Sequence, residues 1–367
     1  MGRQTSSWRY ISNYQVQILC LIVDWYTIAT TQAMRSNDLT HWRQRSRLGR
    51  RATTAVVLLT LAILFPDVGT AQSDNLPKGK TMPSNESASA YSDVSTLRID
   101  VAAGVATVTI ANPPLNLLDA KLMTDLDRFA ARVVDDPAVR VIVLQSADPD
   151  FFVPHGDMNF VDDPSSFANL EVGENQDQRL NPMQRLFERL RKLPQVTIGM
   201  LRGRARGGGA ELLQALDMRF ASLERGYLAQ MEAPTGIIPG AGGTVYLPRL
   251  VGRARAMEIV LGADLFDAAT AERYGWINRA IPDAKLDHFV DRLARNIAAL
   301  PPGIIPAAKA AMDANFGDPL DALLEQNRLL GETFSQPAAA DLTRKALKAG
   351  AQTRNGERNL EAILHDR

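Results

Sequence analysis

Residues 203–213 read GRARGGGAELL, and they follow an apolar run at 196–201 that reads as a strand. Three consecutive glycines let the backbone turn sharply and leave its N–H groups uncovered by side chains. A helix beginning here would add unpaired N–H donors and the positive end of its dipole, which suits an oxygen that acquires negative charge. Glu211 would stand beside the same space. The alternative is a tight packing turn in which Glu211 is only a favourable charge in the first turn of a helix.

A second glycine-rich turn follows downstream, where residues 232–244 read EAPTGIIPGAGGT. One acid, Glu232, precedes the turn at 239–244. Taken alone, Glu232 could equally be an ordinary charged loop residue in front of a turn that begins a helix. Two acids that each accompany a glycine turn are a stronger indication of a functional site than either acid alone. Neither turn is a phosphate-binding loop of the GxxxxGK[ST] type, because the lysine and hydroxyl positions are missing.

Hydrophobic patterns on both sides of these turns predict alternating strands and helices. Residues 97–101 and 105–110 alternate about Gly104 and predict a hairpin. Further predicted elements are a helix over 120–134 capped by Asp119, a buried strand over 139–145, a helix over 183–193 ended by Pro194, and helices from 286 onward. Repeated strand–strand–helix units followed by helices predict an α/β fold with its helices segregated late. The polar stretch 159–182 is expected to be an irregular, mobile lid or loop.

The first 92 residues differ from the rest of the chain. Five arginines between 43 and 51 precede an apolar run at 52–65, and Pro66 and small residues follow, which is the order of a secretory signal. The run is short for a membrane span. Segment 43–71 is therefore either a genuine export or anchor signal, or part of a gene start placed too far upstream, with Met82 as the true start. Residues 72–92 read as a disordered linker.

We accordingly expect three regions: an atypical extension over 1–92, a core over 93–285 and a helical region over 286–367. Lys and Arg total 41 and Asp and Glu total 41, so the net charge indicates no charge-driven nucleic-acid partner. The single cysteine, Cys20, lies in the extension, which excludes disulfides and cysteine nucleophiles from the rest of the chain. The four histidines form no metal-ligand spacing, and we expect no metal site.

Taken together, the motifs resemble the enoyl-CoA hydratase/isomerase (crotonase) family over roughly residues 95–350. Besides the two glycine turns, the matching stretches are 112–118 (NPPLNLL), 152–158 (FVPHGDM), 252–262 (GRARAMEIVLG) and 268–277 (AATAERYGWI). The resemblance implies an α/β fold of the crotonase type, a spiral of repeated ββα units with a C-terminal helical trimerisation region. Ordered motifs are specific for a fold and less specific for the reaction, since one fold hosts many chemistries.

By resemblance, the backbone N–H groups of Gly156 and Gly208 would hold the carbonyl oxygen of an acyl-CoA thioester and stabilise the enolate. Glu211 would hold and activate the water that adds at C3, and Glu232 would deliver or remove the C2 proton. Two nearby carboxyls in a partly apolar site should have separated pKa values, which lets one act as an acid and the other as a base.

The resemblance also implies substrate-binding positions. These are His155, Asp157, Met158, Gly207, Pro239 and Gly240, together with Lys309, which would approach the CoA of a neighbouring subunit. Lys309 is equally well explained as a surface lysine.

Three features depart from the family pattern. His155 replaces a common glycine and either touches substrate or phosphate or faces solvent at the rim of the pocket. Arg204 and Arg206 replace apolar residues and either pair with CoA phosphates or lie in solvent or at a subunit contact. The spacing from Glu211 to Glu232 is one residue longer than in common hydratases, and we place the extra residue in a hairpin around 224–226.

The implied reaction is hydration of trans-2-enoyl-CoA to 3-hydroxyacyl-CoA, as in fatty acid β-oxidation, with coenzyme A as part of the substrate and no separate cofactor. The alternatives are isomerisation or another crotonase-fold acyl-CoA reaction, and a non-catalytic paralogue that binds CoA esters or RNA. We expect a homotrimer or homohexamer with no nucleic-acid or membrane partner for the catalytic domain. A cytoplasmic location is expected unless 43–71 is a genuine signal.

Overall fold

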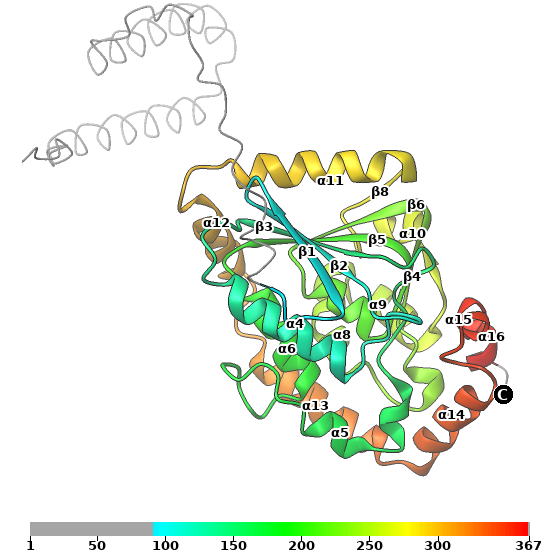
Figure 1. Ribbon diagram of the computed structural model, residues 1–367. Coiled ribbons are helices and arrows are strands. Elements are labelled where there is room, and N and C mark those ends of the chain that lie inside the picture. The colour runs from blue at the N-terminus through cyan, green and yellow to red at the C-terminus, as the bar shows by residue number, and fades with distance from the viewer. Residues whose placement is uncertain (1–90, 366–367) are drawn as a thin grey trace, which may run out of the picture. The chain divides into compact units, whose positions relative to one another are not determined.

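A mostly parallel sheet of eight strands forms the centre of the fold (Figure 1), which a computed structural model describes over residues 91–365. The signal-like segment 43–71 lies outside the described residues, as does nearly all of the linker 72–92. The strands are β1 (Leu97–Ala102), β2 (Val105–Ile110), β3 (Val141–Ser146), β4 (Phe151–Val153), β5 (Val196–Arg206), β6 (Met218–Ala229), β7 (Phe266–Asp267) and β8 (Arg279–Ile281).

Strands β1 and β2 form the predicted antiparallel hairpin, and Ala103 and Gly104 make its turn at φ values of 50° and 79°. The pairs β2–β3, β3–β5 and β5–β6 are parallel. Parallel neighbours need crossover connections, and helices occupy them. The α/β class predicted from the strand–strand–helix pattern is confirmed.

The two longest strands, β5 and β6, each take part in two successive portions of the sheet. The first half of β5 pairs with β3 and that of β6 with β8, whereas their second halves pair with β4 and β7. Between Leu201↔Ala221 and Gly203↔Gly226 the register shifts, because β6 contains extra residues there. The hairpin expected around 224–226 is therefore wrong: these residues belong to a bulge within one strand.

Helices cover both faces of the sheet (Figure 1). On one face, Leu286 and Val290 of α11 (Asp283–Ala298) pack against Val141, Ile198 and Phe220 of the strands. On the other face lie the helices of the main core. They are α4 (Ala120–Val133), α6 (Pro182–Arg191), α7 (Gly208–Gln214), α8 (Gly243–Val251), α9 (Arg253–Gly262) and α10 (Ala268–Tyr274).

The expected helix after Asp119 is confirmed, since the Asp119 carboxylate accepts a hydrogen bond from Leu122 N at 2.8 Å. Helix α6 begins with a reciprocal capping box between Asn181 and Gln184. These caps satisfy N–H groups that the first helical turn leaves unpaired. They set where α4 and α6 begin.

Segment 159–182 is more regular than predicted. A 3₁₀ turn, η1 (Met158–Val161), and a short helix, α5 (Pro164–Ala168), occupy its first half. The second half is held by Arg185, a buried guanidinium that donates to the carbonyls of Leu170, Val172 and Leu180, each at 2.9 Å. The interpretation of this stretch as irregular is wrong for most of 159–168, and in the second half Arg185 supplies donors for carbonyl groups that have no partner within the loop.

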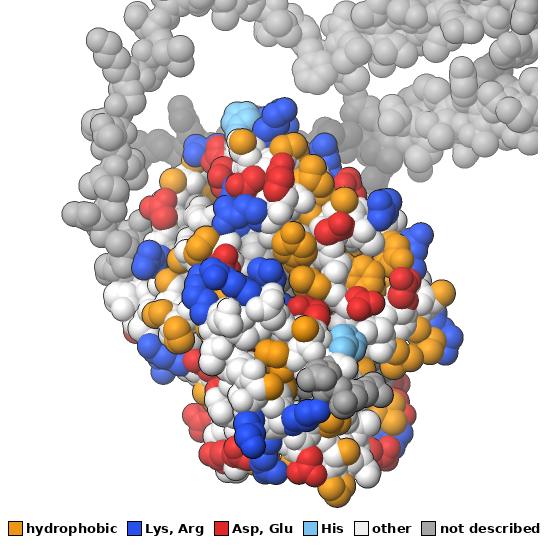
Figure 2. Space-filling view, turned by 90° about the vertical axis from the view of Figure 1, so that its right-hand side faces the viewer, with side chains coloured by type: hydrophobic (Ala, Val, Ile, Leu, Met, Phe, Trp, Pro, Cys, Tyr) orange, Lys and Arg blue, Asp and Glu red, His pale blue; other side chains and the backbone are white. Residues whose placement is uncertain are grey.

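Six helices form the C-terminal region. They are α11 (Asp283–Ala298), α12 (Ile304–Asp313), α13 (Leu320–Phe334), α14 (Pro337–Lys348), α15 (Arg354–Arg358) and α16 (Leu360–His365). Ala346, Leu360 and Leu364 pack against Met231, next to Glu232, so this region reaches the functional loops. Figure 2 shows the side of the molecule that carries α15 and α16, where basic and acidic side chains intermingle. Across residues 91–365 no helix combines the length and apolarity needed to cross a lipid bilayer.

Candidate active site

The turn from β5 into α7 brings Gly208 against Gly156. Gly207 has φ 47°, a conformation that residues with a side chain rarely adopt. Gly209 lets α7 lie against β4, since a Cβ there would fall 2.0 Å from Val153 O. A Cβ on Gly208 would lie 3.6 Å from the backbone nitrogen of Gly156. Gly209 therefore serves close packing, whereas Gly208 meets Gly156 as the resemblance implies.

The N–H group of Gly156 is directed away from its neighbouring strand. Leu118 N donates to His155 O at 3.0 Å and Asp157 N donates to Leu118 O at 3.2 Å, which makes an isolated parallel bridge. Because successive N–H groups of extended backbone alternate in direction, that of Gly156 points to the opposite side. Neither Gly156 N nor Gly208 N donates to a protein acceptor within the described part of the chain.

Glu211 is held by the second glycine turn. Its Oε1 accepts hydrogen bonds from Ala241 N at 2.8 Å and Gly243 N at 2.6 Å. The side chain is buried, and this burial raises the pKa of Glu211 to about 7, although the two N–H donors oppose the shift.

Glu232 lies just beyond β6, where it precedes a 3₁₀ turn, η2 (Ala233–Thr235). With its amide nitrogen turned toward Glu232, Gln230 donates to Oε2 at 3.0 Å and to Oε1 at 3.3 Å. Burial, followed by the charge of Glu211, raises the pKa of Glu232 well above its usual value. Because the charge of Glu211 raises the pKa of Glu232, the ionisation of one carboxyl depends on that of the other.

Both glutamates and both glycines line a single cavity of about 430 Å³. Its wall is mostly apolar. The hydrophobic lining residues include Phe160, Val161, Phe167, Met183, Ile237, Ile238, Leu330 and Phe334. A cavity of this kind combines a few polar groups with an apolar wall, as small-molecule binding sites commonly do. Over the described residues no group of three or more His, Cys, Asp or Glu side chains is arranged to hold a metal ion.

Most of the predicted site residues meet in this cavity. His155, Asp157, Met158, Gly207 and Gly240 line it together with the four central residues Gly156, Gly208, Glu211 and Glu232.

Two predicted residues do not line this cavity. Pro239 lies behind the wall, where its carbonyl accepts a hydrogen bond from Gln326. Lys309 lies elsewhere on the chain and donates to Asp217 Oδ2 at 2.7 Å and Gln195 O at 2.9 Å.

The solvent-facing interpretations of His155 and Arg206 are wrong. His155 is 2% exposed and Arg206 is 0% exposed. Both contact acids of the C-terminal helices, and buried polar or charged side chains require such partners. Arg204 is half-buried, with its guanidinium 5.5 Å from the centre of the Tyr227 ring.

Two residues that organise the site gave no signal in the sequence. Gln326 of α13 is buried, and it accepts from Gly242 N while donating to Pro239 O and Thr244 Oγ1. Glu357 of α15 is 0% exposed and contacts His155 and Arg206. A single glutamine or glutamate on an amphipathic helix looks like any solvated residue, so no pattern could have identified them.

Comparison with known proteins gives the family. Residues 100–355 match the enoyl-CoA hydratase/isomerase family. The chain is 29% identical to a short-chain-enoyl-CoA hydratase of Clostridium acetobutylicum over 63% of its own length and 86% of that protein. It is 30% identical to a probable enoyl-CoA hydratase of Rhodobacter capsulatus, with 65% and 89% covered.

Among solved structures, a putative enoyl-CoA hydratase from Streptomyces avermitilis is 49% identical, with a TM-score of 0.70, and the match covers 74% of this chain and 97% of that one. The cavity with two glutamates and two unpaired glycine N–H groups thus occurs on the fold of these relatives. With a family match that spans well over half of its length, the chain belongs to the enoyl-CoA hydratase/isomerase family.

Proposed function

We propose that this protein adds water to trans-2-enoyl-CoA thioesters to give 3-hydroxyacyl-CoA. The observation that carries the proposal is the convergence of Glu211, Glu232 and the free N–H groups of Gly156 and Gly208 in one cavity. Two carboxyls supply an acid and a base, and two N–H donors supply a site for an oxyanion.

In the proposed reaction the thioester oxygen accepts hydrogen bonds from Gly156 N and Gly208 N. Water attacks C3 as Glu211 takes one of its protons, and the electron pair of the C2–C3 double bond moves toward the thioester oxygen to give an enolate. The enolate then takes a proton at C2 from Glu232. One water molecule is consumed, and the proton gained by Glu211 replaces the one lost by Glu232 when the two carboxyls re-equilibrate.

The protonation order of the two acids supports these roles. Both pKa values are raised by burial, and the charge of Glu211 raises that of Glu232 further. Glu211 therefore ionises first and can serve as the base, while Glu232 keeps its proton and can serve as the acid. When Glu211 ionises, the pair holds a single proton, and this is the state that the proposed reaction uses.

The apolar lining of the cavity supports a hydrocarbon chain as the acyl group. Phe160, Phe167, Leu330 and Phe334 offer apolar surface, and transfer of each CH₂ into such surroundings is worth about 0.8 kcal/mol. We expect kcat/KM to rise with acyl length from crotonyl-CoA to medium-chain enoyl-CoA esters. Coenzyme A enters as part of the substrate, and the proposal involves no separate cofactor.

The test is a hydration assay on a panel of trans-2-enoyl-CoA esters, with the product identified by its gain of one water in mass spectrometry. Glu211→Gln and Glu232→Gln should each lower kcat by at least roughly 100-fold, since each removes an acid–base group. Glu332→Gln, at an exposed position, is the matched control. A product of unchanged mass would indicate an isomerase, and binding of every ester without turnover would indicate a non-catalytic paralogue.

We also propose assembly as a homotrimer or homohexamer. Leu261 on α9, Met312 on α12 and Phe316 just after α12 are about 60% exposed, which is unusual for side chains of this size. Light scattering of the purified protein tests the assembly. Sequencing of the native N-terminus separates a start at Met82, expected for a cytoplasmic protein, from cleavage close to residue 71, expected for an exported one.

A further inference from the structure

A buried carboxylate on the C-terminal helix α15 connects the two backbone segments that carry Gly156 and Gly208. Glu357 Oε1 lies 2.9 Å from Nε2 of His155, and Glu357 Oε2 lies 3.4 Å from Nη1 of Arg206. The side chains of all three residues are at most 3% exposed. His155 immediately precedes Gly156, and Arg206 lies two residues before Gly208.

Hydrogen bonding at His155 defines its protonation. Nδ1 lies 2.6 Å from the carbonyl oxygen of Gly156, which can only accept, so Nδ1 carries a proton. Nε2 faces Glu357 Oε1, which also accepts from Gln352 N at 2.8 Å. Both ring nitrogens thus face acceptors, and the imidazolium form satisfies both contacts.

The second arm of the connection is Arg206. Its Nη2 donates to the backbone carbonyl of Glu357 at 2.9 Å, and its Nε donates to Glu361 Oε1 at 2.6 Å. Arg206 ends β5, directly before the turn through Gly207. A guanidinium held at several points fixes the position of the backbone that carries it.

The cluster contains two carboxylates, Glu357 and Glu361. Arg206 contacts both of them, the charge of Arg204 also acts on Glu361, and His155 contacts Glu357. Burial alone would raise the pKa of Glu357, but His155, Gln352 N and Arg206 hold that pKa below its usual value. The carboxylate of Asp157, next along the chain, is directed to Asn159 and Gln352 instead.

We propose that Glu357 is a positioning residue that sets the distance between the Gly156 and Gly208 N–H donors by anchoring His155 and Arg206, and that it holds His155 as an imidazolium behind Gly156. The inference rests on the proposed function, because it assigns these donors to a thioester oxygen. The positive charge of the imidazolium would also stabilise the negatively charged enolate, in addition to the two N–H groups.

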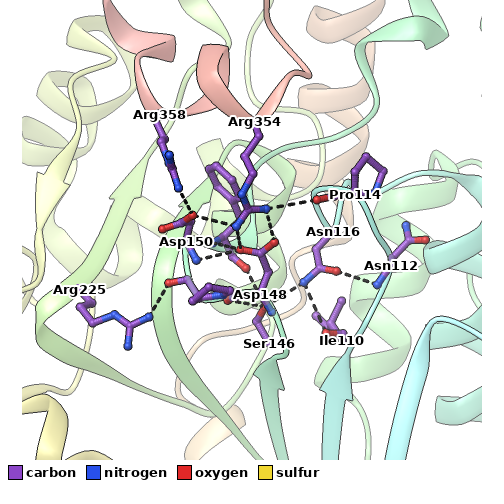
Figure 3. Close-up of polar contacts among 12 residues, drawn as sticks. Ile110, Asn112, Pro114, Asn116, Ser146, Asp148, Asp150, Arg225, Arg354 and Arg358 are labelled. Carbon is purple, nitrogen blue, oxygen red and sulfur yellow. Dashed lines mark hydrogen bonds and ion pairs between the residues drawn. The ribbon is translucent and has the colours of Figure 1, made fainter.

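A separate set of contacts docks the same helix and supplies a control. Arg354 donates to Asp148 Oδ2 at 2.7 Å and to Asp150 Oδ2 at 2.8 Å, and Arg358 donates to Asp150 Oδ2 at 2.7 Å. Figure 3 shows both arginines reaching from the C-terminal helix toward this acidic loop, with Arg225 approaching from another side. These contacts hold α15 from outside without touching His155.

The experiment compares Glu357→Gln with Arg354→Gln in the full chain. For Glu357→Gln we expect kcat for hydration of crotonyl-CoA to fall roughly 10- to 100-fold while KM changes little, since misplaced donors weaken the transition state more than the ground state. The infrared stretch of the carbonyl group of bound crotonyl-CoA should move back toward its frequency in water. Arg354→Gln should lower Tm and leave kcat and the carbonyl frequency close to those of the wild type.

A double-mutant cycle and a spectroscopic measurement extend the test. His155→Gln combined with Glu357→Gln should lower kcat no further than the more severe single change, because the two residues act through each other. Nuclear magnetic resonance of isotope-labelled histidine, assigned through His155→Gln, should show a proton on both ring nitrogens of His155 in the wild type, because both nitrogens face acceptors. This measurement uses the wild-type protein and does not depend on the folding of any variant.

The outcomes separate the two proposals. An unchanged carbonyl frequency in Glu357→Gln, or equal losses of kcat and Tm in both helix variants, would overturn the positioning role. A neutral His155 in the wild type at pH 7 would overturn the charge assignment. If the wild type polarises the bound carbonyl but turns over no ester, the proposed hydration fails while the positioning inference is still tested by the carbonyl frequency.

Discussion

Gly243 donates its backbone N–H to Oε1 of Glu211 at 2.6 Å, so the second glycine turn holds the acid of the first. The first glycine turn in the same way lies close to the acid of the second. A Cβ on Gly207 would lie only 2.7 Å from Oε1 of Glu232, so a side chain at position 207 would collide with this carboxyl. Each glycine turn therefore makes room for the glutamate that belongs to the other. This reciprocal arrangement explains why two distant motifs act as one site, and it leads to the first prediction.

Gly243→Ala should lower kcat by roughly 10- to 100-fold, because a displacement of about 1 Å at a reacting group has effects of this size. The added Cβ would lie 2.8 Å from Glu211 Oε1 and 2.7 Å from Pro239 Cβ. Steady-state hydration kinetics measure the change. Gly262→Ala is the control, since its nearest atom would be 3.9 Å away. Normal activity in Gly243→Ala would mean that the position of Glu211 is unimportant.

Glu211→Gln should stabilise the fold at alkaline pH. The pKa of Glu211 is about 7 in the folded protein against an ordinary value of 4.5, so the unfolded chain loses this proton first as pH rises. The free energy of unfolding of the wild type therefore decreases between these two pH values and stays lower above about 7. Gln keeps an oxygen for Ala241 N and Gly243 N without the charge.

The measurement is Tm of wild type and variant at pH values on both sides of this window. We expect the variant to be more stable than the wild type at about pH 8, with a smaller difference at about pH 4. Glu232, whose pKa is also raised by burial, acts in the same direction. A difference in Tm that does not change with pH would contradict the assignment of a raised pKa to this carboxyl.

Gln326→Leu should loosen the glycine turn from behind. The substitution leaves Gly242 N and Pro239 O without their side-chain partner, and an unsatisfied buried polar group costs about 1–3 kcal/mol. We expect a loss of stability of this order in chemical unfolding and a fall in kcat, because Ala241 and Gly243 of the same turn hold Glu211. Gln336→Leu changes the same residue type at an exposed position and should alter neither quantity.

Arg185→Met should free the loop over 169–181. Three carbonyl groups lose their donor, and the buried stem of the side chain keeps its apolar packing. We expect faster cleavage after Glu171 or Glu174 by a glutamate-specific protease, measured by mass spectrometry of the fragments. Arg179→Gln, which removes an exposed arginine that contacts Asp177, is the control. Equal cleavage rates in the two variants would show that Arg185 does not hold the loop.

Local patterns predicted the elements well where side-chain periodicity and burial agree. The hairpin around Gly104 and the helix capped by Asp119 are confirmed, with ends that differ by a residue or so. Strand β5 was expected to end at Leu201 and continues to Arg206. Arg202, Arg204 and Arg206 interrupt the apolar pattern in its second half, which is why the sequence did not predict a strand there. That half is nevertheless a strand, because it pairs with β4 and β6, which lie elsewhere in the sequence.

The sequence by itself determined the two glycine turns, their acids and the family's fold, because each depends on residues that are neighbours along the chain. Only the tertiary structure decided which groups face one another: Gly156 against Gly208, Gly243 against Glu211, and His155 against Glu357. His155 and Glu357 are 202 positions apart, and a histidine next to a glycine reads the same whether it is buried or exposed. Its burial follows from the packing of α15, which supplies a carboxylate as the hydrogen-bond partner that a buried imidazole needs.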